Sequence, residues 1–185
     1  MRHDIPILNA VDGSLIFGRV LLDEVIASNQ ATVDLDLVSG FSKYEIELYG
    51  IVPGTDTNTL QMRFSFDNGV TFNSSAIYNW SIATHVSTIT ITTNAADTEI
   101  QLSVGTLGSA TGENYSGLLR IDNLGGGLGA SIISGNAAYK NNGGTTTGVK
   151  IAATLTSTTA GITNIRFFMA SGNIASGTFT SFGIM

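Results

Sequence analysis

The chain contains no cysteine, which excludes disulfide bonds, thiolate metal sites and cysteine nucleophiles. Charged residues make up only 12% of the sequence, and lysine and arginine together number 8. With a net charge of -6, the chain lacks the basic footprint of a nucleic-acid-binding protein and is poorly suited to anionic lipid. No apolar run is long enough for a transmembrane helix, because Arg19, Asp23 and Glu24 interrupt the longest one near the N-terminus. We therefore expect neither a nucleic-acid partner nor membrane insertion.

The composition that remains is typical of a β protein. Hydrophobic residues make up 43% of the sequence, glycine occurs 22 times, and threonine and serine form several runs. This composition suits short strands joined by tight turns, and it suits neither a helical bundle nor a disordered chain. A length of 185 residues fits one domain with a substantial core.

The clearest strand pattern lies in Phe41–Phe72. Apolar and charged residues alternate over 43–48, and apolar and polar residues alternate over 60–66, so each segment has one apolar face. Pro53-Gly54 and a polar turn separate them. The stretch predicts two half-buried strands that pair with each other in an antiparallel sheet.

Turn signals recur about every eight to twelve residues elsewhere in the chain, which is typical of a sandwich or barrel. The apolar run 20–27 suits a helix as well as a strand, and the turn at 28–30 after it favours a strand. We predict further strands over 33–37, 78–82, 88–93, 99–104, 118–122, 130–134, 137–140, 149–155, 162–170 and 177–184. Their number and the absence of a convincing helix favour an antiparallel two-sheet jelly-roll sandwich over residues 20–185.

Residues 1–19 hold neither a helical nor a strand period and are expected to form an N-terminal extension, which wraps its own domain or docks on a neighbour. They also lack the apolar core and cleavage site of a secretion signal.

Ser65–Phe72 matches the Asp-box pattern S-x-D-x-G-x-T-[WF]. Asp67 is expected to accept hydrogen bonds from turn amides, and Gly69 to adopt a positive φ. In sialidase-like propellers this box is a repeated structural turn, whereas here it occurs once. We interpret it as a structural hairpin turn without glycosidase activity.

Two pairs of carboxylates are catalytic candidates, since glycosidases use such pairs. Glu45 and Glu47 share one strand face, and so do Asp34 and Asp36. Alternation places both pairs opposite an apolar face, so a solvated surface is the simpler interpretation. A calcium site at Asp34 and Asp36 is a further hypothesis, but no loop motif supplies ligands at defined offsets.

The remaining catalytic motifs are missing. His3 and His85 are the two histidines, and no G-x-S-x-G nucleophile elbow accompanies them. The glycine-rich Gly125–Gly129 segment is not followed by a helix and does not form a dinucleotide fingerprint. We expect no enzyme activity, no cofactor and no metal.

Aromatic residues offer two candidates for glycan recognition. Tyr78 and Trp80 share a face with Ile82, which favours a place in the core over a sugar-stacking platform. Tyr115, Tyr139 and the loop Asn141–Gly148 are interpreted as lying in exposed turns, where binding residues are common on rigid β scaffolds. The predicted glycan- or receptor-binding residues are therefore Tyr115, Tyr139, Asn141 and Asn142.

Two segments together resemble virion-surface proteins of tailed bacteriophages. Ala31–Phe72 resembles a shared pattern of an ATVDL-like strand, a second strand ending in I-V-P-G-T, and L-x-M-R-F-S-x-D-x-G-x-T-F. Arg166–Ile184 resembles the ending of such chains: R-F, a Ser-Gly loop, I-x-S-G-T-F and a final G-I. The resemblance implies a jelly-roll module of a tail fibre, receptor-binding tip or capsid decoration, usually a homotrimer. It transfers no catalytic residues.

The resemblance leads to one main functional hypothesis and two others. The chain is expected to be a structural virion protein, assembled in the host cytoplasm and exposed on the particle, with residues 1–19 contacting other virion proteins. The alternative is a carbohydrate-binding module that recognises host-surface glycans. An enzyme that cleaves surface polysaccharide is disfavoured, because carboxylates on a solvated face lack a pocket.

Overall fold

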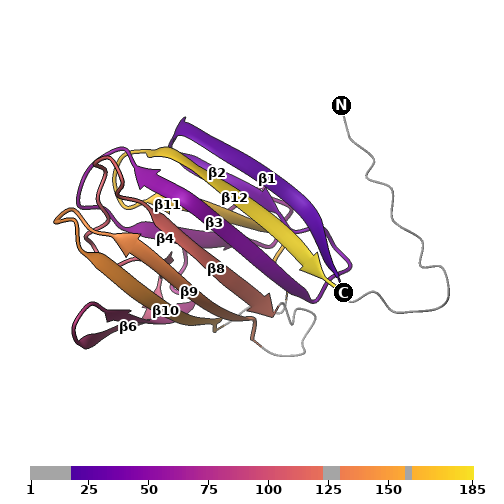
Figure 1. Ribbon diagram of the computed structural model, residues 1–185. Coiled ribbons are helices and arrows are strands. Elements are labelled where there is room, and N and C mark those ends of the chain that lie inside the picture. The colour runs from indigo at the N-terminus through magenta and orange to yellow at the C-terminus, as the bar shows by residue number, and fades with distance from the viewer. Residues whose placement is uncertain (1–17, 123–129, 157–159) are drawn as a thin grey trace.

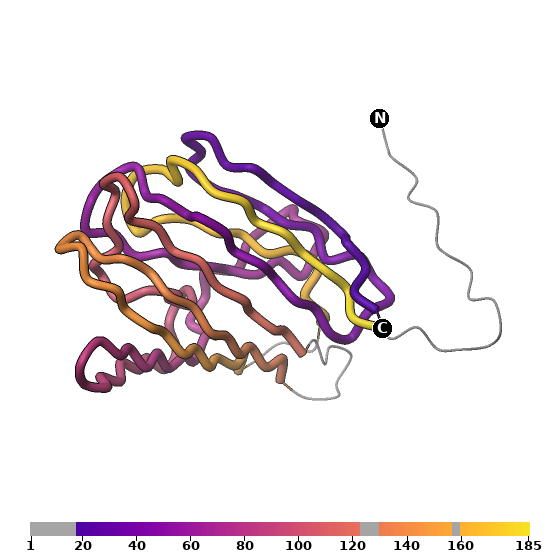
Figure 2. The backbone as a smooth tube through the Cα atoms, in the orientation of Figure 1, coloured from indigo at the N-terminus to yellow at the C-terminus, as the bar shows by residue number. Residues whose placement is uncertain are grey.

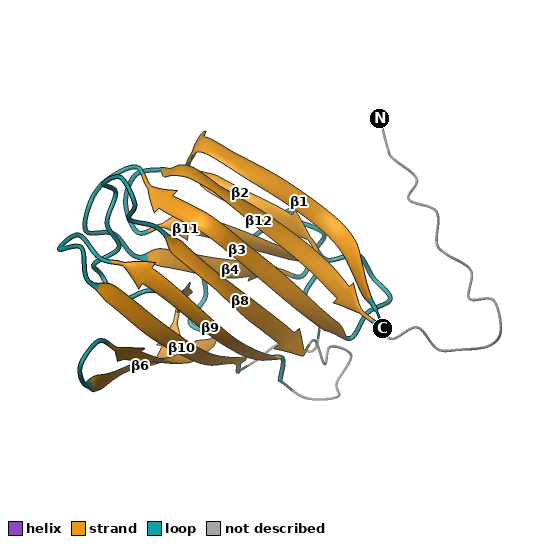
Figure 3. Cartoon of the chain, in the orientation of Figure 1, coloured by secondary structure: helices purple, strands orange, loops and turns teal. Residues whose placement is uncertain are grey.

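The computed structural model describes residues 18–122, 130–156 and 160–185, and within them the chain is all-β (Figure 1). The twelve strands are β1 (Arg19–Gln30), β2 (Thr32–Asp36), β3 (Lys43–Pro53), β4 (Leu60–Ser65), β5 (Tyr78–His85), β6 (Ile89–Asp97), β7 (Ile100–Gln101), β8 (Tyr115–Asp122), β9 (Ile132–Lys140), β10 (Thr146–Leu155), β11 (Asn164–Met169) and β12 (Ile174–Ile184). The described segments contain strands, turns and loops only, as Figure 3 shows by colour, and no helix that could span a membrane. The expected two-sheet antiparallel sandwich is confirmed.

The two sheets differ in width. The larger has eight strands in the order β1-β12-β3-β8-β9-β10-β5-β6, and the smaller has four in the order β2-β11-β4-β7. The larger sheet curves around the smaller one, so that β1 lies beside β2 and β5 lies beside β7. The trace in Figure 2 shows β6 extending past the sandwich, at the lower left.

Strand pairing follows a nested order. The chain pairs β1 with β12, β2 with β11, β3 with β8 and β4 with β7, all antiparallel. These pairs fall alternately in the larger and the smaller sheet. The remaining strands, β5, β6, β9 and β10, extend the larger sheet beyond β8.

Aromatic and aliphatic side chains from the inner faces of both sheets form one core. Phe167 of β11 packs on Phe179 of β12 with ring centroids 5.1 Å apart, which joins the two sheets directly. Phe64 of β4 packs on Tyr78 of β5 at 6.2 Å. Trp80 is buried, so the prediction that Tyr78 and Trp80 belong to the core is confirmed.

The predicted pairing of the two strands in Phe41–Phe72 is wrong. β3 pairs with β12 and β8 in the larger sheet, whereas β4 pairs with β11 and β7 in the smaller one. The turn after Pro53 therefore carries the chain from one sheet to the other. Period-two alternation is the same for both arrangements, because each strand still turns one face to the shared core.

Two other strand predictions need correction. The segments 130–134 and 137–140 were expected to be separate, but β9 runs through Gly135 without a break. A Cβ atom at Gly135 would lie 2.5 Å from Leu119 Cδ2, so glycine is needed here for close packing in the strand and not for a turn. In the segment 99–104 only β7 is a strand, although Leu102 beyond it is still buried.

The strand predicted over 88–93 forms as β6, but its isoleucines do not enter the core. Ile89 and Ile91 are 72% and 65% exposed. None of the nine residues of β6 is buried. The alternation of isoleucine and threonine is real, but the pairing with β5 places both isoleucines on the outer face with Ala83, whereas Thr92 lies opposite the buried Ile82.

Some predictions concern residues that the structure does not describe. Residues 1–17 of the predicted extension and the glycine-rich segment 125–129 lie outside the described residues, and so does His3. Arg19, the last residue assigned to the extension, is the first residue of β1.

Candidate functional site

Loops gather at the end of the sandwich where Asn141 and Asn142 lie. Asn141 Oδ1 accepts hydrogen bonds from the backbone N–H groups of Gly143 and Thr145, at 3.0 and 2.8 Å. Asn142 Nδ2 donates to Thr57 Oγ1 at 3.0 Å. Both side chains therefore hold this loop cluster together, and their amides already have protein partners.

The structure contradicts the expected exposure of Tyr115 and Tyr139. Both lie in strands, β8 and β9, and their side chains are buried. They are directly opposite one another in the sheet, and their rings stack with centroids 6.2 Å apart. Buried rings offer no platform to a sugar, so these two tyrosines are removed from the candidate site.

The hydroxyl groups of this tyrosine pair differ. The Tyr139 hydroxyl lies 3.2 Å from Thr106 Oγ1, whereas the buried Tyr115 hydroxyl has no hydrogen-bond partner among the described residues. Burial raises the pKa of Tyr115 well above the usual value of a tyrosine. A neutral buried phenol of this kind is a packing group.

Asp67 organises the turn after β4. Its carboxylate accepts hydrogen bonds from Ser65 Oγ, Thr71 Oγ1 and the Thr71 backbone N–H, at 2.6, 2.6 and 2.9 Å. The Ser65 and Thr71 hydrogen bonds lower the pKa of Asp67 to about 2. Gly69 has a φ of 79°, and Phe64 O accepts from the Asn73 N–H at 2.9 Å to close the loop. No strand follows to pair with β4, so the segment is a closed turn and not the expected hairpin.

The carboxylates Glu45 and Glu47 are neutralised by arginines. Glu45 lies 2.8 Å from Arg120 and 3.1 Å from Arg19, and Glu47 lies 2.7 Å from Arg19. Glu45 is only 8% exposed, so its expected place on a solvated face is wrong; the two arginines cover it. The hydrogen bond to Glu45 raises the pKa of Arg120 above its usual value. These carboxylates are committed to ion pairs.

The carboxylates Asp34 and Asp36 are also occupied. Asp34 forms a two-point ion pair with Arg166, both N···O distances being 2.7 Å. The guanidinium of Arg166 in turn lies 3.9 Å from the centre of the Phe72 ring. Asp36 accepts a hydrogen bond from the side-chain amide of Asn164. No group of three His, Cys, Asp or Glu side chains that could hold a metal occurs among the described residues.

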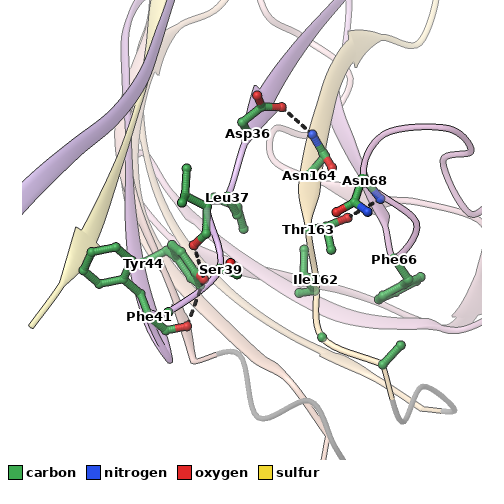
Figure 4. A pocket seen from close by; sticks show the side chains of 14 residues that line it. Asp36, Leu37, Ser39, Phe41, Tyr44, Phe66, Asn68, Ile162, Thr163 and Asn164 are labelled. Atoms are coloured by element: carbon green, nitrogen blue, oxygen red, sulfur yellow. Dashed lines mark hydrogen bonds between the residues drawn. The ribbon is translucent and has the colours of Figure 1, made fainter. Parts of the chain in front are cut away.

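A cavity of about 620 Å³ opens at the opposite end of the sandwich, between the β2–β3 loop and the segment 160–164 (Figure 4). Tyr44 lies beside Phe41 on the side formed by the β2–β3 loop, and its hydroxyl forms hydrogen bonds with the carbonyl oxygens of Phe41 and Val38 at 2.9 and 3.1 Å. Asp36 is the only carboxylate among the described residues of the lining. Those residues supply no second carboxylate to pair with it as general acid and base, and they combine hydrogen-bonding groups with apolar side chains such as Phe41 and Phe66.

A shallow groove of about 570 Å³ crosses the outer face of the larger sheet over β8, β9, β10 and β5. Strand register places its lining in two rows: Ala83, Lys150, Asn136 and Leu118, then Ser81, Ala152, Ser134 and Arg120. The small alanine, serine and Gly135 residues form the bottom of the groove. The longer side chains of Arg120, Asn136 and Lys150 supply hydrogen-bond donors. Lys150 forms no ion pair with any described residue.

No sequence motif marks this groove. Its lining comes from four strands that are far apart in the chain, and alternation marks these residues only as outward-facing. His85, which was considered for catalysis, lies exposed at the end of β5 and is not part of the lining.

No protein-family model, curated protein or solved structure matches this chain. The class that the fold defines is a two-sheet antiparallel β-sandwich.

Proposed function

We propose that the chain is a structural virion protein of a tailed bacteriophage, a jelly roll exposed on the particle. The four nested strand pairs, alternating between the sheets, support the jelly-roll assignment: a jelly roll arises when one long hairpin of strand pairs rolls up into two sheets. Strands β5, β6, β9 and β10 are then additions to that unit.

One observation carries the proposal. The two segments with the phage-like patterns, Ala31–Phe72 and Arg166–Ile184, are separated by most of the chain, yet they form adjacent strands. β11 lies between β2 and β4, and β12 pairs with β3. The shared patterns therefore belong to one structural unit, to which the intervening sequence adds β7 in the smaller sheet and β8, β9, β10, β5 and β6 in the larger one.

The ion pairs on the surface support a scaffold role. The candidate carboxylates Glu45, Glu47 and Asp34 are paired with arginines. In this proposal the unit forms a homotrimer, residues 1–19 contact another virion protein, and the loops face outward.

The experiment that tests the proposal is detection of the chain in phage particles. Antibody raised against the purified protein should label particles produced by a phage that encodes it, and mass spectrometry of washed particles should recover its peptides. A variant that lacks residues 1–17 should fold, as judged by far-UV circular dichroism, but should be lost from particles. Absence of the full-length protein from particles would contradict the proposed function. Retention of the truncated protein would contradict the anchor role alone.

A second function, binding of an acidic glycan, is favoured by the groove on the larger sheet. Lys150, which has no ion-pair partner among the described residues, provides positive charge there, and Asn136 and two serines provide hydrogen-bonding groups; Arg120 is already paired with Glu45. This candidate site takes the place of the tyrosines that the sequence suggested.

A glycan array tests this second function. Wild-type protein should bind carboxylated glycans, and the double variant N136A/K150A should lose that binding. Lys140→Ala, an exposed lysine outside the groove, is the matched control and should bind normally. An array without hits for the wild-type protein would exclude the groove as a glycan site.

A further inference from the structure

The two edges of the larger sheet are protected to very different degrees. An edge strand presents unpaired N–H and C=O groups, and proteins normally protect such an edge with charges, bulges or cover from another element. β1 carries Arg19, Asp23 and Glu24, has a register shift between Leu21 and Asp23, and lies beside β2. β6, at the other edge, has none of these protections along most of its length.

Among the described residues, β6 pairs with β5 alone, and its outer edge has no partner strand. No residue of β6 belongs to the core. From Val86 to Ala96 the sequence contains no charged residue and no proline. Exposed Ile89 and Ile91 lie on one face of the strand, the face that also carries Ala83 of β5.

Side-chain hydrogen bonds also attach the C-terminal end of β6 to β5. Trp80 Nε1 donates to Asp97 Oδ2 at 2.9 Å, and the Ala96 N–H donates to Asn79 Oδ1 at 2.8 Å. β6 is therefore fixed at its C-terminal end to the buried part of β5, and its exposed isoleucines lie in the part of the strand that follows the turn after β5 (Figure 1 shows the strand). A preorganised edge loses little conformational entropy when it pairs.

We propose that β6 is a docking edge for a second copy of this chain. Residues 88–92 read Thr-Ile-Thr-Ile-Thr, which is the same in both directions. When two copies pair antiparallel about Thr90, Ile89 of one copy lies opposite Ile91 of the other, and each threonine lies opposite a threonine. All four isoleucines then share one face, and each contact occurs twice, as a twofold interface requires.

Charge also favours a second copy as the occupant. Because the paired segment is uncharged, two copies meet without like charges opposite one another, whereas self-pairing of β1 would bring its acidic residues together. The contact is small: a five-residue pairing lies below the roughly 1,600 Å² of a standard stable interface. We therefore expect a reversible dimer of the free protein, strengthened where many copies are held close together on one particle. This twofold contact is separate from the proposed trimer.

Cysteine substitution tests the register directly, because the natural chain has no cysteine. Residues directly opposite in an antiparallel pair have Cα atoms about 4.5–5.5 Å apart, which is within the range of a disulfide. Thr90→Cys should therefore give a disulfide-linked dimer under mild oxidation. Asn94→Cys, on the same strand but away from the twofold axis, should not, and Ile26→Cys on β1 is the second control.

Solution mass supplies an independent test. Light scattering over a dilution series should show that Ile91→Lys halves the mass at a given concentration and weakens association more than tenfold. Ile26→Lys introduces the same change at a site 69% exposed on the other edge and should leave the mass unchanged. Mass that is halved by Ile91→Lys supports the proposal whether the wild-type protein is a dimer or a hexamer. Crosslinking of Thr90→Cys no faster than Ile26→Cys, together with a mass unaffected by Ile91→Lys, would overturn it.

Discussion

The strands at the two edges of the larger sheet, β1 and β6, both expose isoleucine side chains, and they differ in what lies behind them. Leu22 and Val25 of β1 pack against the core, and β2 of the smaller sheet lies alongside. β6 projects past the smaller sheet and, within the described part of the chain, pairs with β5 alone. The comparison shows that the burial of an edge strand in this fold depends on the layer beneath it as well as on its own sequence.

The largest expected effect comes from removing the support of β6. Trp80→Ala should destabilise the protein by about 3–5 kcal/mol, because it empties a buried site and breaks the hydrogen bond to Asp97. Relative to the wild-type protein, amide hydrogen exchange should accelerate more in residues 89–97 than in residues 19–30. Trp80→Phe, which keeps most of the ring volume, should show the same regional pattern with a smaller loss. Equal acceleration at both edges would mean that β6 does not depend specifically on β5.

Two tyrosine-to-phenylalanine substitutions compare a hydrogen-bonded buried hydroxyl in β5, that of Tyr78, with an unpartnered one in β8, that of Tyr115. The Tyr78 hydroxyl accepts a hydrogen bond from the Phe64 N–H and donates to Asn73 O, at 3.1 and 2.8 Å. Tyr78→Phe leaves a buried N–H without a partner and should cost about 1–3 kcal/mol in unfolding free energy. Tyr115→Phe removes a buried hydroxyl that already lacks a partner and should be neutral or stabilising. Urea unfolding of both variants measures the difference, and equal losses would contradict it.

At the β1 edge the expected effect is smaller. Arg19 bridges Glu45 and Glu47, and its guanidinium lies 3.9 Å from the centre of the Phe182 ring. Arg19→Ala should cost about 1 kcal/mol, since Arg19 is half exposed and Arg120 still neutralises Glu45. Faster hydrogen exchange should be confined to β1. Arg19→Lys keeps the charge but loses the two-point geometry, so it should recover only part of the loss.

The sequence predicted the strands well because alternation is a local property. β1, β2, β5, β8, β10 and β12 all form where period-two patterns or short apolar runs indicated them. Pairing is not local: β3 and β4 carry the same alternation, yet they belong to different sheets. The turn after Pro53 does not reveal this, since a crossover between sheets and a hairpin use the same turn residues.

The candidate sites were predicted less well, for two physical reasons. Tyr115 and Tyr139 follow or precede asparagine and glycine residues that suggested turns, but the pairing of β8 with β9 places both rings inward. The groove around Asn136 and Lys150 depends on small residues in neighbouring strands, which no single segment reveals. A site made by register between distant strands becomes visible only once the order of the strands is known.

The smallest expected effect concerns Asp67, which supports neither edge and so serves as a reference for both. Its pKa in the folded protein is about 2, below the usual 3.8, because the charged carboxylate accepts the hydrogen bonds of the turn. A lowered folded-state pKa stabilises the protein above the usual pKa, and this contribution is lost as the pH falls from about 4 to about 2. Unfolding free energy should therefore fall less steeply over that range in Asp67→Asn than in the wild-type protein. Hydrogen exchange in β1 and β6 should be the same in both proteins, and a change at either edge would show that this turn is coupled to the larger sheet.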